Sequence, residues 1–172
     1  DSGRLVPSLR RASPRAMALV DDAARVGEEG GSVRTLLGRT SPAPSAAWRD
    51  LHADAAEPEA SDAIKTLARS RARERGRFTR NFVVQGTAAE WALAWLADLR
   101  QRLAVFPSVG GHPVTARAHL AFFLHDEIIV HAPAEHAEAA AAAVREAADA
   151  AGRLLFGSFP LDFLLDVRIA VS

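Results

Sequence analysis

Hydrophobic and polar residues alternate most regularly near the end of the chain, over residues 161–171. Every second position there is apolar and large: Leu161, Phe163, Leu165, Val167, Ile169 and Val171. A period of two places such residues on one face of an extended backbone. The pattern therefore predicts a half-buried β-strand over residues 161–171.

Two shorter apolar runs lie upstream, at residues 118–124 and 128–131. Only the polar residues His125, Asp126 and Glu127 separate them. Two apolar runs joined by so short a link are typical of a β-hairpin. We expect two strands, which are antiparallel if the turn is tight.

The first half of the chain favours helices. Ser13 and Pro14 are typical of a helix start, and Gly30 follows residues 15–29 as an end signal. A second helix is predicted over residues 62–75, and Gly76 is expected to stop it.

Two more helices are predicted in the second half. Thr87 and Glu90 have the spacing of a capping box, which would begin a helix that runs to about residue 103. An alanine-rich helix is expected over residues 133–156, closed by Gly157. The helix after Thr87 carries an apolar stripe that is typical of a core face rather than a ligand platform. Its members are Trp91, Trp95, Leu99 and Leu103.

The remaining segments show weaker patterns. A short strand is predicted at residues 33–37, an irregular connection at residues 41–61, and a loop at residues 106–117. The fold class that results is α+β, with a small antiparallel sheet backed by helices and preceded by a mostly helical N-terminal segment. We expect two parts, residues 1–76 with an irregular loop at 42–61, and residues 77–172.

The composition limits which cross-links, metal sites and cellular compartments we expect for the protein. The 172 residues include no cysteine, which excludes disulfides and thiolate metal sites. Every apolar run is too short to span a membrane, and the first residues have no signal-peptide pattern. We therefore predict a cytoplasmic protein with no membrane partner, and expect this chain to be a piece of a longer one.

The net charge of zero hides two unlike halves. Residues 1–80 carry 15 basic and 11 acidic side chains, whereas residues 81–172 carry 6 and 10. The basic excess lies in residues 65–80, where seven basic side chains accompany one acid, Glu74. This Arg-rich segment, with Arg71 and Arg73 near its middle, is either a polyanion-binding surface or a solvated helix face.

Asp126 and Glu127 are adjacent acids between two apolar strands, with no Lys or Arg from residue 120 to residue 132. Burial of an unpaired carboxylate is strongly unfavourable, so the acids require either water or a cation. Two interpretations remain open, an exposed turn and a metal site.

Arg77, Asn81 and Gln85 are spaced by four residues, so they would project the same way from a helix. Each side chain can donate hydrogen bonds. The DNA minor groove presents acceptors at similar positions for every base pair, so donors placed there can check pair shape without reading sequence.

Both segments resemble parts of a known family. Residues 77–89 resemble the R-x-x-x-N-x-x-x-Q-G-T-A-A segment of family A, Pol I-like DNA polymerases, and residues 124–129 resemble that family's palm motif C, with its His-Asp-Glu. The similarity is good over residues 74–171, thin over 13–42, and absent over 43–73. Within the thin part, residues 31–42 look like the family's turn between fingers and palm.

The resemblance implies a role for each matching residue. Asp126 would bind the catalytic Mg²⁺ ions and the neighbouring Glu127 would support the site, so both are candidate catalytic and metal-binding residues. His125 would contact the primer end, and Arg77, Asn81 and Gln85 the primer-template DNA. The implied activity is template-directed transfer of deoxynucleotides from dNTPs by two-metal catalysis, in DNA replication or repair.

The chain also departs from the family. It has no counterpart of the family's motif A aspartate, the other metal ligand, or of the fingers helix that holds the incoming nucleotide. We therefore expect residues 77–172 to form the palm subdomain of a C-terminal part that does not polymerise alone. The sequence as a whole resembles the branch of the family described as bifunctional 3′-5′ exonuclease and polymerase.

Two alternatives belong to other classes. If residues 125–131 were one continuous strand, His125, Glu127 and His131 would share a face and could hold zinc or manganese in a metallohydrolase. A non-catalytic DNA-binding module with a palm-like fold is the other alternative. It would bind nucleic acid with a steep salt dependence and without metal-dependent chemistry.

Overall fold

The computed structural model of the chain describes residues 2–111 and 114–170, with side chains from residue 7 onward. The described residues contain helices and one two-stranded antiparallel sheet, so the predicted α+β class is confirmed. Contacts divide the chain into two units, residues 1–88 and 89–172, and their boundary falls inside one long helix. Each unit is described below by itself. No helix in the described part is long and apolar enough to cross a membrane.

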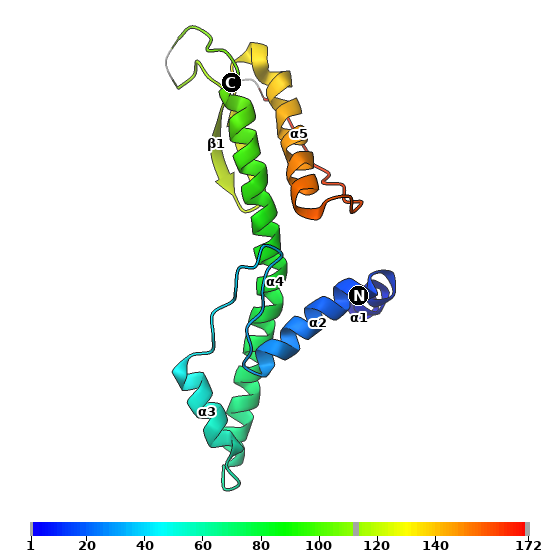
Figure 1. Cartoon of the computed structure of the whole chain (residues 1–172), viewed down its shortest axis with the longest axis vertical. Coiled ribbons are helices and arrows are strands. Elements are labelled where there is room, and N and C mark those ends of the chain that lie inside the picture. The colour runs from blue at the N-terminus through cyan, green and yellow to red at the C-terminus, as the bar shows by residue number, and fades with distance from the viewer. Residues whose placement is uncertain (1, 112–113, 171–172) are drawn as a thin grey trace. The chain divides into compact units, whose positions relative to one another are not determined.

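The first unit is helical (Figure 1). It contains α1 (Ser2–Ala12), α2 (Pro14–Glu28), α3 (Ala46–Ala56) and the first part of α4 (Asp62–Ala104). The predicted start of α2 is confirmed, with Pro14 at the first helical position. Its small core joins Ala23 of α2, Val33 of the following loop and Val83 of α4.

Close contact between α2 and α4 depends on glycine. A Cβ on Gly27 would lie 2.8 Å from Thr79 Cγ2 and 2.9 Å from Arg75 O. A Cβ on Gly76 would lie 2.9 Å from Ala24 O. The Thr79 hydroxyl, fully buried at this crossing, donates to Ala23 O at 2.7 Å.

The prediction that Gly76 stops a helix is therefore wrong. The α4 helix continues through Gly76 and Gly86 to Ala104. Glycine occupies both positions because a neighbouring segment leaves no room for a side chain there. The predicted capping box is also wrong, because Thr87 lies inside α4 and not at the start of a helix. Its Oγ1 accepts a hydrogen bond from Leu36 N at 3.3 Å.

Two further predictions in this unit are corrected. The connection over residues 41–61 contains α3, which Ser45 caps by accepting a hydrogen bond from Trp48 N at 3.2 Å. Trp48 then stacks on His52 one turn later, with ring centroids 3.5 Å apart. The strand predicted at residues 33–37 is reduced to a single bridge between Arg34 and Thr40.

The second unit packs a hairpin and a helix against the end of α4. The hairpin consists of β1 (His119–Leu124) and β2 (Glu127–His131), and the short 3₁₀ helix η1 (Ala134–His136) leads into α5 (Ala137–Phe156). Both strands are found within one residue of the predicted bounds, and Gly157 closes α5 as predicted, but α5 begins at Ala137 rather than at Pro133. Figure 1 shows α5 beside the C-terminal part of α4.

Small residues allow α5 to approach α4 closely. Its buried face is formed almost entirely by alanines, and it contacts the predicted stripe of Trp95, Leu99 and Leu103. Trp95 Nε1 donates to Val144 O at 3.0 Å. Arg102 joins the same two helices at the surface, with ion pairs of 2.6 Å to both Asp98 and Glu146.

The hairpin has an inner and an outer face. Leu120, Ile128 and Val130 pack against the α4 and α5 core. Cross-strand partners share a face, so the pairs His119 with His131 and Phe122 with Ile129 lie on the outer face. A bulge at Ala121 interrupts β1 between Leu120 and Phe122.

The strand predicted over residues 161–171 is wrong as a strand, although its alternation is real. Residues 161–170 are extended but belong to no sheet, and Val171 lies outside the described residues. Phe163, Leu165 and Val167 pack against the core, whereas Leu164 is 94% exposed. Alternation of apolar and polar residues requires only that one side of the segment packs against an apolar surface. A β-strand also requires a neighbouring strand that pairs with its backbone N–H and C=O groups.

Candidate functional site

The predicted acidic turn lies at the tip of the hairpin. Leu124 pairs with Glu127, so only His125 and Asp126 form the turn between β1 and β2. His125 has φ = 56°, in the left-handed region that few residues other than glycine adopt, although histidine does so more often than most. The turn fixes all three residues of this hairpin tip, His125, Asp126 and Glu127, in solvent-exposed positions.

Exposure resolves the energetic difficulty of two adjacent acids. Water reaches Asp126 and Glu127, and neither carboxylate forms an ion pair with any residue in the described ranges. Carboxylate oxygens are the ligands that Mg²⁺ prefers, so the donor chemistry fits magnesium. Within residues 2–111 and 114–170, however, no group of three His, Cys, Asp or Glu residues could hold a metal ion. The tip presents two exposed carboxylates, and their binding of Mg²⁺ stays a prediction.

The second predicted group lies on α4. Arg77, Asn81 and Gln85 are helical and exposed, and successive members at four-residue spacing advance by about 40° around the helix axis. They therefore form one gently winding stripe of hydrogen-bond donors. Arg69 and Arg73 extend the stripe toward the start of α4 and are exposed as well.

The Arg-rich segment divides into side chains with different surroundings. Arg73 is exposed and forms no ion pair among the described residues. Arg71 Nη1 lies 2.7 Å from Glu74 Oε2, so the charge of Arg71 is partly compensated. Of these two predicted DNA contacts, Arg73 is the freer cation.

Arg75 points inward from the same segment. Its Nη2 donates to Gly31 O at 2.8 Å and to Pro42 O at 2.9 Å, which holds the 31–42 loop against α4. Burial lowers the pKa of the Arg75 guanidinium from its ordinary value. Arg75 is therefore a structural residue, and the basic surface is smaller than the count of arginines suggests.

The predicted site residues thus form two groups within different units. The hairpin tip belongs to residues 89–172, and the α4 stripe to residues 1–88. The turn at the hairpin tip was predicted from the sequence, whereas residues 77–85 lay between two predicted helices and are found inside α4.

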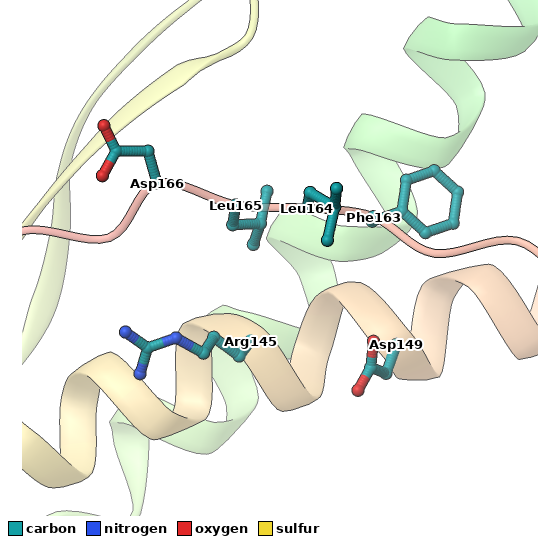
Figure 2. Close-up of a pocket in the computed structure, with 6 residues that line it drawn as sticks. All are labelled: Arg145, Asp149, Phe163, Leu164, Leu165 and Asp166. Atoms are coloured by element: carbon teal, nitrogen blue, oxygen red, sulfur yellow. The ribbon is translucent and has the colours of Figure 1, made fainter.

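A surface hollow of about 510 Å³ lies elsewhere, between α5 and the extended segment. Figure 2 shows Arg145 and Asp149 projecting from α5, with residues 163–166 running beside them. None of the predicted site residues lines it. The four-residue spacing of Arg145 and Asp149 is a weak sequence signal of a shared helix face, and nothing in the sequence indicates that residues 163–166 cover it.

Comparison of the chain with protein-family models, with curated proteins and with solved structures gave no match.

Proposed function

We propose that this chain is the palm part of a family A-like DNA polymerase, with the hairpin tip as its share of the metal site. One observation carries the proposal. His125 and Asp126 form a two-residue turn and Glu127 begins β2, which exposes Asp126 and Glu127 together at a hairpin tip. A carboxylate pair in such an exposed position can reach both a metal ion and a DNA end.

The three residues at the tip would have different roles. Asp126 and Glu127 would hold Mg²⁺ through their carboxylate oxygens, and His125 would contact the primer end. Bound magnesium ions supply charge neutralisation at the attacking and leaving oxygens of phosphoryl transfer. No nucleophilic side chain is needed, because the primer hydroxyl is the nucleophile.

The α4 stripe supports the same function. Asn81 and Gln85 present neutral donors suited to the acceptors of the minor groove, whereas Arg73 and Arg77 carry charges suited to phosphates. Donors that contact every base pair alike position a duplex without selecting its sequence. A polymerase requires this kind of contact with its primer-template.

Metal binding at the tip can be tested with Mn²⁺, a paramagnetic substitute for Mg²⁺, by amide NMR of the chain bound to primer-template DNA. We expect Mn²⁺ to broaden the signals of residues 125–127 first, and Asp126→Asn to abolish this selectivity. Asp166→Asn, which changes an exposed aspartate outside the hairpin, is the control. Broadening that ignores Asp126→Asn would contradict the proposal.

Catalysis by the chain alone is not expected, since residues 1–172 contain no counterpart of the second aspartate or of the fingers helix. Template-directed incorporation of dNTPs by this polypeptide, abolished by Asp126→Ala, would show that the site is complete and that our assignment of a partial site is wrong.

The exposed basic side chains of α4 also favour a second candidate, a non-catalytic DNA-binding module. This candidate predicts the same affinity for DNA with no selective metal binding at the tip. The metallohydrolase alternative has less support, because the turn at His125 and Asp126 separates His125 from the strand face that carries Glu127 and His131.

A further inference from the structure

Two histidines face each other at the open end of the hairpin, far along both strands from the acidic tip. His119 begins β1, His131 ends β2, and the two are direct cross-strand partners. Both are half-buried on the outer face of the hairpin, and their ring centroids lie 5.1 Å apart at an interplanar angle of 41°.

Main-chain carbonyl groups hold one nitrogen of each ring. His119 Nδ1 lies 3.0 Å from Arg117 O, and His131 Nε2 lies 3.3 Å from Thr115 O. A carbonyl oxygen only accepts, so each of these nitrogens carries the proton and donates it. The opposite nitrogens, His119 Nε2 and His131 Nδ1, are then unprotonated in the neutral rings. Neither has a hydrogen-bond partner in the described part of the chain.

This arrangement has the features of a metal ligand pair. A histidine that binds a metal through one nitrogen usually donates its other N–H to a carbonyl or carboxylate, which fixes the ring and its tautomer. Two imidazoles that share a tetrahedral zinc ion at about 2.0–2.1 Å have ring centroids roughly 5 Å apart. The observed separation requires little movement of either ring.

We propose that His119 and His131 bind a divalent transition-metal ion of the zinc type, with water completing its coordination. Imidazole nitrogen suits zinc, copper and nickel, whereas magnesium and calcium prefer oxygen. The site is therefore chemically distinct from the acidic tip and does not depend on the proposed function. It also differs from the metallohydrolase alternative, because it uses neither His125 nor Glu127.

Metal bound here would join the two ends of the hairpin. It would also tie them to the preceding loop, since the carbonyls of Thr115 and Arg117 orient the two rings. The Arg117 guanidinium is directed elsewhere, with Nε donating to Ser108 Oγ at 2.7 Å. The expected result is a more stable hairpin in the presence of zinc, because a ligand that binds only the folded state stabilises it.

Calorimetric titration of the whole chain with Zn²⁺, in buffer without magnesium, tests the site. His119→Ala and His131→Ala each remove one proposed metal ligand. Each should weaken zinc binding by about tenfold or more, because loss of even a residue that only orients a metal ligand has an effect of that size. His125→Ala removes a histidine from the same hairpin and should leave the affinity unchanged. Unchanged affinity in the two pair variants, or an equal loss in His125→Ala, would overturn the proposal.

NMR of the histidine side chains in the unmodified chain keeps the test independent of whether the variants fold. Zn²⁺ should shift the ring signals of His119 and His131 before those of the other histidines. Ring signals that do not respond to Zn²⁺ would overturn the proposal, as would shifts that begin at other histidines.

Discussion

Gly27 and Thr79 show how single residues determine the packing of the first unit. The Thr79 side chain occupies the space that a Cβ at Gly27 would need, and its hydroxyl is satisfied by the Ala23 carbonyl. Sequence alone identified neither residue, because a glycine inside a helix is read as a weak point rather than as a contact.

We predict that Gly27→Ala destabilises the chain despite the better helix propensity of alanine. The added methyl would meet both the Thr79 side chain and the Arg75 carbonyl, and overpacking of this kind costs about 1–3 kcal/mol of the free energy of unfolding. Urea denaturation followed by circular dichroism measures the change. Gly110→Ala is the matched control, since a Cβ there meets nothing within 4 Å. Equal stability of the two variants would contradict the packing described for α2 and α4.

At the scale of elements, the extended segment over residues 161–170 depends on side chains rather than on backbone pairing. Phe163 stacks on Trp91 with ring centroids 4.1 Å apart and an interplanar angle of 9°. Gly152 of α5 leaves room for this ring, since a Cβ there would lie 2.8 Å from Phe163 Cε2.

Phe163→Ala is therefore expected to release this segment from the core. Loss of a partly buried aromatic ring should reduce the free energy of unfolding by roughly 1–3 kcal/mol and expose Trp91 to water. A red shift of tryptophan emission, together with urea denaturation, reports both effects. Leu164→Ala removes a neighbouring side chain that is 94% exposed, and should change neither reading. If Leu164→Ala had the larger effect, the assigned packing of the segment would be wrong.

The elements that sequence predicted well are those defined by local patterns. The hairpin followed from two apolar runs and a short polar link, and α5 from an alanine-rich stretch between Pro133 and Gly157. The continuity of α4 and the absence of a third strand from residues 161–170 did not follow, because each depends on neighbours remote in sequence. The His119 and His131 pair also needed the strand register, which the bulge at Ala121 shifts.

At the scale of the whole molecule, charge distribution is the property that sequence described best. The basic excess of residues 65–80 lies on α4, of which the part up to residue 75 was predicted as a surface helix. Only the structure separates its members into the free Arg73, the paired Arg71 and the inward Arg75. The hairpin tip was likewise predicted as a turn, and the structure adds that both of its acids are exposed.

The different charge pairing of Arg73 and Arg71 predicts how DNA binding responds to salt. Arg73→Ala should reduce the slope of log affinity against log salt by about 1, because one phosphate contact is lost. Arg71→Ala should reduce it less, since Glu74 already compensates that charge. Fluorescence anisotropy with labelled duplex DNA at several salt concentrations measures the slopes.

Arg100→Ala is the control for this series, because Arg100 is an exposed arginine on the same helix but outside the stripe. An unchanged slope in Arg73→Ala would assign the Arg-rich segment to a solvated face with no role in binding.

The bulge at Ala121 gives the hairpin a tolerance in chain length. Leu120 pairs with Val130 and Phe122 with Ile129, so Ala121 is the one residue of β1 without a partner across the ladder. A homologous chain that lacked this position would keep every other cross-strand pair, and no side chain would change faces. A deletion of this one residue should therefore leave both the acidic tip and the histidine pair in place.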